Sequence, residues 1–354
     1  SRPTRRWSRG SRRWGSCADT LGAVRTLGTP PSSVVSPDGT IHYGCYRGSL
    51  PPVDLRPIGK SLPYRVLHHK KWVYLAIASE DVFVGLAVVD LGYATNAFGF
   101  AFDRVSNRML VDRSAIGHPA SGKVEDSLLS NRLARFAAGG TRVELSRRGD
   151  DLDIDASFGP DFELRARVDT RVSHKALAVI GPIPKGVVNA TEKHALLPVT
   201  GELVTQGARR SLDGAFGGWD YTHGYLARHT QWRWAYLLGR TKEGRRVGMN
   251  LTEGFLGEIE CVVWLDDELH PVGEGRFEFN ARDPMSPWRI RTTCGAVDLR
   301  FTPGGLHAEH KDFKVLRSHF VQPVGCYDGT ITIGKTTATL ERVLGVAEDQ
   351  DVVW

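Results

Sequence analysis

Residues 217–236, GGWDYTHGYLARHTQWRWAY, bring ionisable side chains and large aromatic ones together in a short stretch. Ionisable groups are costly to bury among aromatic rings unless they are paired or take part in chemistry. We therefore expect the functional site in this segment. A buried Asp220 would have a raised pKa, and with a nearby His223 it could exchange protons with a substrate near neutral pH.

These two candidate proton-transfer residues fall on opposite sides of the segment if it forms an extended strand. Successive side chains of a strand point to opposite faces, so Asp220 and His223 converge only where the chain bends. Gly224 offers a place for such a bend or bulge. The alternative is that Asp220 pairs with an arginine such as Arg228 and simply fixes the strand.

The aromatic residues of the segment allow two interpretations. Trp232, Trp234 and Tyr236 share one face of the expected strand, and Trp219 and Tyr221 flank Asp220. A stripe of this kind usually packs in a core. It could instead form an aromatic wall for a flat or apolar ligand, because ligand pockets combine many aromatic groups with few polar ones.

Three further polar residues interrupt segments that otherwise read as apolar strands. Lys193 lies in NATEKHALLPVTGEL, Asn250 in VGMNLTEGF and Glu258 in GEIECVVW. We expect that they could project into the same cavity as Asp220. Taken singly, each is more often a surface residue or a buried hydrogen-bond partner.

Other motifs carry less chemistry. Residues 307–312, HAEHKD, have metal-ligand side chains, but in a strand they alternate between two faces, so we predict no metal site. Residues 68–71, HHKK, resemble a solvated turn before a strand. The chain contains no G-x-S-x-G, H-E-x-x-H, Walker or dinucleotide fingerprint, which argues against common hydrolases, zinc proteases, NTPases and Rossmann dehydrogenases. We predict no cofactor.

Charge and cysteine content narrow the class of protein. The formal charge is +6, and residues 1–16 contain six arginines and no acid, so the rest of the chain is neutral. The chain therefore lacks the basic field expected of a nucleic-acid partner. No apolar run approaches the ~20 residues of a membrane span. Five scattered cysteines without a C-x-x-C pair argue against a disulfide framework and favour a reducing compartment, so we expect a cytoplasmic protein.

Short alternating segments separated by turn residues dominate the sequence. Residues 142–168 read as three strands with turns at 148–151 and 159–161, and later turns fall at 242–244, at 266–267 and near Gly295. Connections this short join antiparallel neighbours. Residues 125–137 are the one stretch that fits a helix. The sequence therefore predicts a nearly all-β fold.

A weak internal repeat suggests two related β units. Residues 142–152 are similar to 296–306, with a constant offset between matching apolar residues. We divide the chain into an Arg-rich arm and linker at 1–39, a first β unit at 40–185 and a second at 186–354. Each unit is expected to form an antiparallel barrel or a curled β-sandwich, because closure removes exposed edges. A barrel of about eight strands can enclose one small ligand.

Longer stretches of the sequence resemble a known family. NATEKHALLPVTGEL, GGWDYTHGYLARHTQWRWA, GMNLTEGF, SPWRI, VDLRFTP and FVQPVGCYDGTI resemble the bacterial domain-of-unknown-function family 2804, over about residues 40–345. More distantly, W-D-x-x-H-G at 219–224 is similar to an element of lipocalin-like tandem-barrel proteins, among them carotenoid hydratases, tocopherol-cyclase-like proteins and AttH-type proteins. This similarity implies two calycin-like β units with an apolar cavity. In the hydratase-like members an aspartate is thought to protonate an alkene, and the matching residue is Asp220, with Tyr221 and His223 beside it.

The leading hypothesis is a protein that holds a hydrophobic small molecule, such as a lipid, an isoprenoid or a polyketide-like compound. Cofactor-independent hydration, cyclisation or isomerisation would then use Asp220 as proton donor and His223 as its partner. Lys193, Asn250 or Glu258 would orient the ligand or stabilise charge.

The aromatic faces around Asp220 would serve a developing carbocation, and they come from Trp219, Trp232 and Trp234. A rival hypothesis is a binding or carrier protein without turnover. A third is an interaction protein whose barrels are filled by side chains and leave no cavity.

Overall fold

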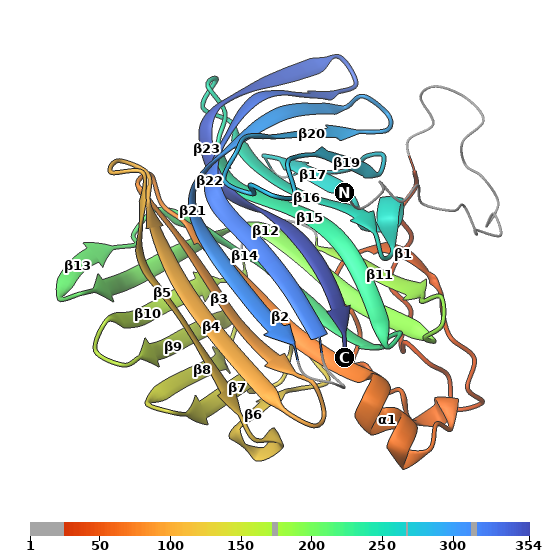
Figure 1. Ribbon diagram of the computed structural model, residues 1–354. Helices are drawn as coiled ribbons and strands as arrows, with labels where there is room; N and C mark the ends of the chain where they lie inside the picture. Colours follow the sequence, from red (N-terminus) through yellow and green to blue (C-terminus); the bar gives the residue numbers. More distant parts are fainter. Residues whose placement is uncertain (1–24, 172–175, 267, 313–316) are drawn as a thin grey trace.

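The computed structural model describes residues 25–171, 176–266, 268–312 and 317–354 (Figure 1). The part of the chain described is nearly all-β, as predicted, and the expected turns at 148–151, 159–161 and 242–244 connect neighbouring strands. Most of the Arg-rich arm lies outside the described residues. None of the helices among the described residues combines the length and apolarity needed to cross a membrane.

The strands form two antiparallel sheets. The first runs in the order β5-β4-β3-β2-β14-β12-β10-β9-β8-β7-β6, in which β11 and β13 also pair with β12, and β1 pairs with β11. Its strands are β1 (Gly44–Arg47), β2 (His69–Ala78), β3 (Val82–Asp90), β4 (Thr95–Asp103), β5 (Arg108–Gly117), β6 (Gly122–Val124), β7 (Arg132–Ala138), β8 (Thr141–Arg148), β9 (Asp151–Phe158), β10 (Phe162–Asp169), β11 (Leu177–Pro182), β12 (Val188–Thr205), β13 (Ala208–Ser211) and β14 (Ala215–Tyr225).

The second sheet runs in the order β18-β17-β16-β15-β23-β22-β21-β20-β19. Its strands are β15 (His229–Arg240), β16 (Arg246–Gly254), β17 (Val262–Leu265), β18 (Glu268–Pro271), β19 (Gly275–Glu278), β20 (Trp288–Thr292), β21 (Val297–Asp312), β22 (Arg317–Ile333) and β23 (Thr336–Val353). The two sheets curl into a nearly closed barrel and a half-barrel that pack side by side (Figure 1).

The chain passes from the first sheet to the second between Tyr225 and His229. The WDYTHG segment therefore lies in β14, in the middle of the first sheet, whereas we expected it in the second unit. Strand β12 pairs with β10, and β14 pairs with β2, so both strands belong to the first sheet.

The expected helix at 125–137 is wrong. Residues 132–138 form β7, which pairs with β8, and the burial of Leu133, Ala134 and Phe136 against exposed Arg132 and Arg135 fits a strand with a bulge. The α-helix that does occur among the described residues is α1 (Leu62–His68).

Helix α1 begins with a side-chain cap, in which the Ser61 hydroxyl accepts from the backbone N–H of Tyr64, and Pro63 stands in its first turn. Three short 3-10 turns complete the elements: η1 (Arg56–Ile58), η2 (Pro119–Ser121) and η3 (Gly257–Glu260).

Apolar side chains of the described residues form three large layers and a smaller cluster that includes Leu226 and Trp354. One fills the inside of the first sheet, and a second fills the inside of the second sheet. The third lies between the sheets, where Tyr74 and Phe98 meet Trp234 and Val346. Strand β2 contributes to two layers because Val73 points inward and Tyr74 outward, which explains why residues 72–78 read as a continuous apolar run.

The two sheets approach each other closely at β14. A Cβ atom on Gly218 would lie 2.0 Å from the Tyr236 hydroxyl of β15, so only glycine fits there.

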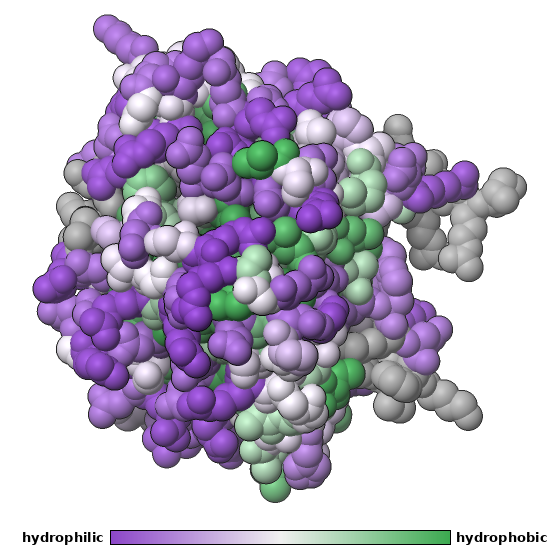
Figure 2. All heavy atoms as spheres, turned by 90° about the vertical axis from the view of Figure 1, so that its left-hand side faces the viewer, coloured by the Kyte–Doolittle hydropathy of each residue, from purple (hydrophilic) through white to green (hydrophobic). Residues whose placement is uncertain are grey.

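The face of the molecule seen in Figure 2 is mostly hydrophilic, with hydrophobic residues exposed only in patches.

Candidate functional site

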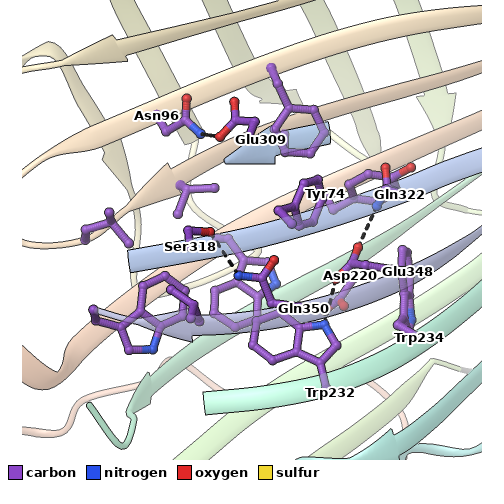
Figure 3. A pocket seen from close by; sticks show the side chains of 18 of the residues that line it. Tyr74, Asn96, Asp220, Trp232, Trp234, Glu309, Ser318, Gln322, Glu348 and Gln350 are labelled. Carbon is purple, nitrogen blue, oxygen red and sulfur yellow. Dashed lines mark hydrogen bonds between the residues drawn. The ribbon is translucent and has the colours of Figure 1, made fainter. Parts of the chain in front are cut away.

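A cavity of about 280 Å³ lies between the two sheets (Figure 3). Strands β2, β3 and β4 of the first sheet form one wall, and β15, β22 and β23 of the second sheet form the other. Its aromatic lining residues are Trp72, Tyr74, Phe98, Trp232, Trp234, Phe255, Phe320 and Trp354. The cavity is thus largely aromatic, as in pockets that bind apolar ligands.

The pairing register of the first sheet places three polar groups side by side at one end of this cavity. Lys193 of β12 is opposite Asp220 of β14, and Asp220 is opposite Tyr74 of β2. Directly opposed residues on neighbouring strands project from the same face of a sheet. On the next strands Ala87 is opposite Tyr74, and Phe98 is opposite Ala87. The polar residues are therefore followed on the same face of the sheet by apolar ones.

The second sheet supplies a matching row. Trp234 of β15 is opposite Thr252 of β16 and Glu348 of β23, and Trp232 is opposite Gln350. All of these side chains line the cavity. The site is therefore built from long-range strand pairs of both sheets.

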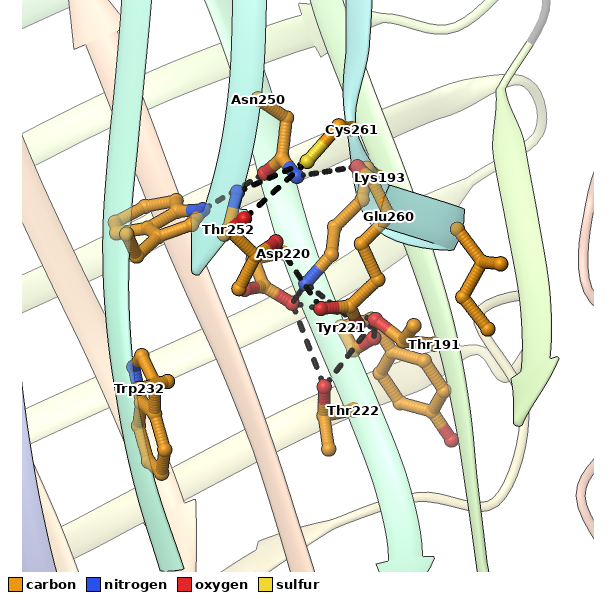
Figure 4. A network of polar contacts seen from close by, with 12 residues as sticks. Thr191, Lys193, Asp220, Tyr221, Thr222, Trp232, Asn250, Thr252, Glu260 and Cys261 are labelled. Carbon is orange, nitrogen blue, oxygen red and sulfur yellow. Dashed lines mark hydrogen bonds and ion pairs between the residues drawn. The ribbon is translucent and has the colours of Figure 1, made fainter. Parts of the chain in front are cut away.

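Lys193 and Asp220 form a buried ion pair (Figure 4). The ammonium Nζ of Lys193 lies 2.6 Å from Asp220 Oδ1, and the hydroxyls of Thr191 and Thr222 each donate to the same oxygen at 3.4 Å. Burial alone would lower the pKa of Lys193, but the attraction of Asp220 and Glu260 outweighs burial and raises it. Lys193 is therefore cationic and stabilises negative charge on Asp220.

Glu260 lies at the end of η3, on the other side of the ammonium. Its Oε1 is 3.8 Å from Lys193 Nζ, and its Oε2 accepts from the Thr252 hydroxyl at 3.2 Å. Burial raises the pKa of Glu260 to about 6, although Lys193 lowers it in part.

Glu348 faces the cavity from the second sheet. Its Oε1 accepts from the indole N–H of Trp232 and its Oε2 from the amide of Gln322, each at 2.6 Å (Figure 3). Burial raises the pKa of Glu348 to about 7, against the opposing effect of these two donors. A carboxyl with this pKa can give and take protons near neutral pH.

His223 does not reach Asp220. Strand β14 pairs with β2 from Phe216 to Tyr225 without a register shift, so Gly224 introduces no bulge and the two side chains stay on opposite faces. His223 Nε2 instead lies 2.5 Å from His69 Nε2. Burial lowers the pKa of His69 to about 4 and that of His223 well below its usual value.

The aromatic neighbours of Asp220 also point away from the cavity. The indole N–H of Trp219 donates to Glu192 at 3.2 Å, and the Tyr221 hydroxyl donates to the backbone carbonyl of Glu125 at 2.9 Å. Both rings belong to the apolar interior of the first sheet. Of the three predicted tryptophans, Trp232 and Trp234 line the cavity and Trp219 does not.

Three other predicted residues occupy different places. Arg228 follows β14 and does not line the cavity, so the partner of Asp220 is Lys193 and not this arginine. Glu258 is exposed on η3, and its backbone carbonyl accepts from the Arg25 side chain at 2.6 Å. Asn250 supports the site from behind, where it accepts from Trp234 Nε1 at 2.7 Å and donates to the Glu260 carbonyl at 2.8 Å.

The cavity residues that the sequence did not single out include Tyr74, Glu260, Gln322 and Glu348. The signal for Glu348 was weak, because in VLGVAEDQDVV it is the first of four consecutive polar residues that include three acids. Glu260 required the geometry of η3, which turns Glu258 outward and Glu260 inward.

Two motifs outside the cavity also have defined places. The predicted solvated turn at 68–71 is wrong, since Lys70 is fully buried in β2 and donates to the Leu91 carbonyl at 2.8 Å. In HAEHKD, Glu309 lines the cavity, while the His307 ring lies 2.7 Å from Asp112. Within the described ranges, His, Cys, Asp and Glu form no group of three that could hold a metal ion.

The model of the family described as "Domain of unknown function (DUF2804)" matches residues 26–354. Among curated proteins, no sequence matches the chain. The fold is similar to that of CghA solved with Sch210972, with a TM-score of 0.52 and 10% identity over 81% of this chain and 89% of that one.

Two further solved structures are similar with lower scores. Kievitone hydratase from Nectria haematococca has a TM-score of 0.49 and 12% identity, over 82% of this chain and 90% of that one. A putative AttH from Nitrosomonas europaea has a TM-score of 0.45 and 13% identity, over 83% and 97%. The family match confirms the predicted family resemblance, and the likeness to CghA confirms the predicted all-β fold class.

Proposed function

The chain belongs to the DUF2804 family, and we propose that it binds an apolar small molecule between its two sheets and catalyses cofactor-independent proton transfer on it. The observation that carries this proposal is an aromatic cavity with proton-exchanging carboxyls at its polar end. Hydration, cyclisation or isomerisation of a lipid, isoprenoid or polyketide-like compound are the reactions that such a site can perform.

Glu348 is the proton donor in this proposal. Protonation of an alkene needs an undissociated acid, and a pKa of about 7 keeps a large share of Glu348 protonated at neutral pH. Its proton forms a C–H bond at one alkene carbon, and the neighbouring carbon becomes a cation. The aromatic walls, including Trp232 and Trp234, stabilise that charge.

The Lys193–Asp220 pair serves the second half of the reaction. In hydration, water adds to the cation and its surplus proton passes to a carboxylate of the cavity. In isomerisation or cyclisation, a C–H proton leaves to the same kind of base. Asp220, 2.6 Å from the Lys193 ammonium, is that acceptor in this proposal, which reverses the donor role expected from the sequence.

A carrier without turnover is the second candidate. This candidate is favoured by the contacts that hold the two carboxyl groups in place. Glu348 accepts hydrogen bonds from two donors, and Asp220 contacts the Lys193 ammonium and two threonine hydroxyls. Groups restrained in this way can orient a ligand without reacting. CghA, solved with Sch210972, is a protein of similar fold that was crystallised with a small molecule, which fits either candidate.

The test begins with native mass spectrometry of the purified protein and organic extraction of the ligand. The extract is then incubated with the protein in D₂O, and deuterium incorporation is measured. We expect E348Q and D220N to lose about 10²–10⁴-fold in rate. E341Q is the matched control, because Glu341 lies on the same strand but is exposed and paired with Lys242.

Retention of the wild-type rate in E348Q would remove Glu348 from the mechanism. A tightly bound ligand that never gains deuterium would support the carrier instead. Absence of binding to any apolar extract would contradict both candidates.

A further inference from the structure

The ionisable side chains that line the cavity are unbalanced in charge. Among the described side chains that line it, the cation Lys193 faces the carboxyl groups of Asp220, Glu260 and Glu348. The Lys193 ammonium forms an ion pair with Asp220, with Nζ 2.6 Å from Oδ1. Glu348 therefore has neutral donors but no cation in hydrogen-bond contact, because Trp232 and Gln322 hold its two oxygens.

The aromatic faces add to this negative character. The face of an aromatic ring carries partial negative charge and attracts a cation, most strongly for tryptophan. Trp72 and Trp232 stack with their centroids 5.9 Å apart, and Tyr74 packs edge-on against Trp234 at 5.2 Å. A ligand between the sheets thus meets rings and carboxyls together.

Buried hydrogen-bond acceptors that lack a donor also favour a ligand that carries N–H groups. The Gln322 amide nitrogen is committed to Glu348, so its Oε1 is fixed as an acceptor, and it has no hydrogen-bond partner among the described residues. Asn96 is similar, because its nitrogen donates to Glu309 and its Oδ1 is unpartnered there. Buried polar atoms are normally satisfied, so a ligand that donates hydrogen bonds fits this wall.

We infer that the cavity selects an apolar ligand that carries a positive charge, such as a hydrophobic amine, over one that carries a carboxylate. This inference rests on the proposed function, in that the cavity must bind a small molecule. It adds the class of ligand: an apolar, flat or isoprenoid-like body with a cationic N–H group directed at Glu348 and Gln322.

The protonation of the wall gives a dependence on pH. The groups that face the ligand are Lys193 on β12, Asp220 on β14, Tyr74 on β2, Glu260 on η3, Glu309 on β21 and Glu348 on β23. Burial raises the pKa of Glu260 to about 6 and that of Glu348 to about 7, so both gain negative charge as pH rises from 5.5 to about 7.5. Affinity for a cation should rise over that interval and affinity for an anion should fall.

Three probes with the same naphthyl body test the inference: naphthylmethylamine, naphthylmethanol and naphthoate. Their binding to the full chain is measured by isothermal titration calorimetry and by quenching of tryptophan fluorescence. We expect the amine to bind about tenfold or more tightly than the carboxylate at pH 7.5, with the alcohol between them. In E348Q the preference for the amine over the carboxylate should fall about tenfold, and E341Q should keep the wild-type preference.

The outcomes separate the inference from the proposed function. Equal or tighter binding of naphthoate than of the amine overturns the charge preference, while binding of the alcohol still supports an apolar cavity. Failure of all three probes to bind overturns both. Because the wild-type ranking needs no variant, the test holds even if E348Q proves unstable, which its melting temperature would reveal.

Discussion

Glu192 and Glu348 are two buried carboxyls with similar surroundings and different places in the molecule. Each accepts a hydrogen bond from an indole N–H, Glu192 from Trp219 and Glu348 from Trp232, and burial raises the pKa of each to about 7. Glu192 sits in the packed interior of the first sheet and also binds the backbone N–H of Leu50 at 2.7 Å. Glu348 lines the cavity between the sheets.

The comparison teaches that a perturbed pKa does not by itself mark a functional site. Glu192 ties the segment before α1 to the first sheet, and its neighbour in sequence, Lys193, points to the opposite face and enters the cavity. The difference between the two carboxyls is access to an open space.

The largest effect is expected when the cavity loses its cation. K193M leaves Asp220 and Glu260 buried without a counter-charge, which should destabilise the protein by about 3–5 kcal/mol. Urea unfolding measures this change. The double variant K193M/D220N removes one of the stranded charges and should recover part of the loss. A K193M protein within about 1 kcal/mol of the wild type would show that the pair is not desolvated.

The second effect is a change of stability with pH. The folded state raises the pKa of Glu348 from 4.5 to about 7, so it binds the proton more tightly than the unfolded chain. The stability from this group is therefore full below about pH 4.5 and lost as pH rises through about 7, by up to about 3 kcal/mol. The free energy of unfolding of E348Q, relative to that of the wild type at the same pH, should therefore rise by that amount between pH 5 and pH 8.

The comparison of E348Q with wild type is needed because other groups titrate. His69 and His223 have lowered pKa values and so contribute stability above pH 6.5 that is lost as pH falls. Their share is common to both proteins and cancels. A stability difference that stays constant from pH 5 to pH 8 would contradict the raised pKa of Glu348.

The third effect separates the two carboxyls directly. In E348Q the amide of Gln322 can rotate and offer its oxygen to the new amide, whereas in E192Q the backbone N–H of Leu50 cannot change its role. Because the two acids share the same raised pKa, the ionisation effect is common to both variants. E192Q should be less stable than E348Q by about 1–2 kcal/mol in denaturant titrations at one pH. The reverse order would mean that Glu348 is the structural residue.

The smallest effect concerns Glu258, which the sequence proposed in place of Glu260. Its side chain is exposed, so E258Q should change stability by less than about 0.5 kcal/mol and leave ligand binding unchanged. E260Q, which alters a buried carboxyl beside Lys193, should change both. Loss of ligand binding in E258Q, as judged by titration with naphthylmethanol, would restore the original assignment.

The sequence was sufficient for the fold class because turn residues and period-two alternation are local signals. It also singled out Lys193, Asp220, Trp232 and Trp234, which line the cavity, because polar groups in apolar strands and stripes of aromatic residues can be recognised from the sequence alone. The pairing of Lys193 with Asp220 was not predictable, because register across β12 and β14 depends on contacts far apart in the chain.

Two further features could not be predicted from the sequence, because they also depend on contacts between residues far apart in the chain. His223 was assigned to Asp220 on the assumption of a bend at Gly224, whereas continuous pairing with β2 keeps β14 regular there. The apolar runs of β2 and β3 predicted buried strands but not that their outer faces would meet a second sheet. The location of the cavity follows from that packing and from no local motif.

The most direct test of a ligand site between the sheets is a crystal structure with the naphthyl probe that binds most tightly. The naphthyl ring is expected between Trp232 and Tyr74, with its polar group within hydrogen-bond distance of Glu348 or Gln322. A ring found inside the first sheet, next to Trp219 and Glu192, would contradict the assignment and make Glu192 the functional carboxyl.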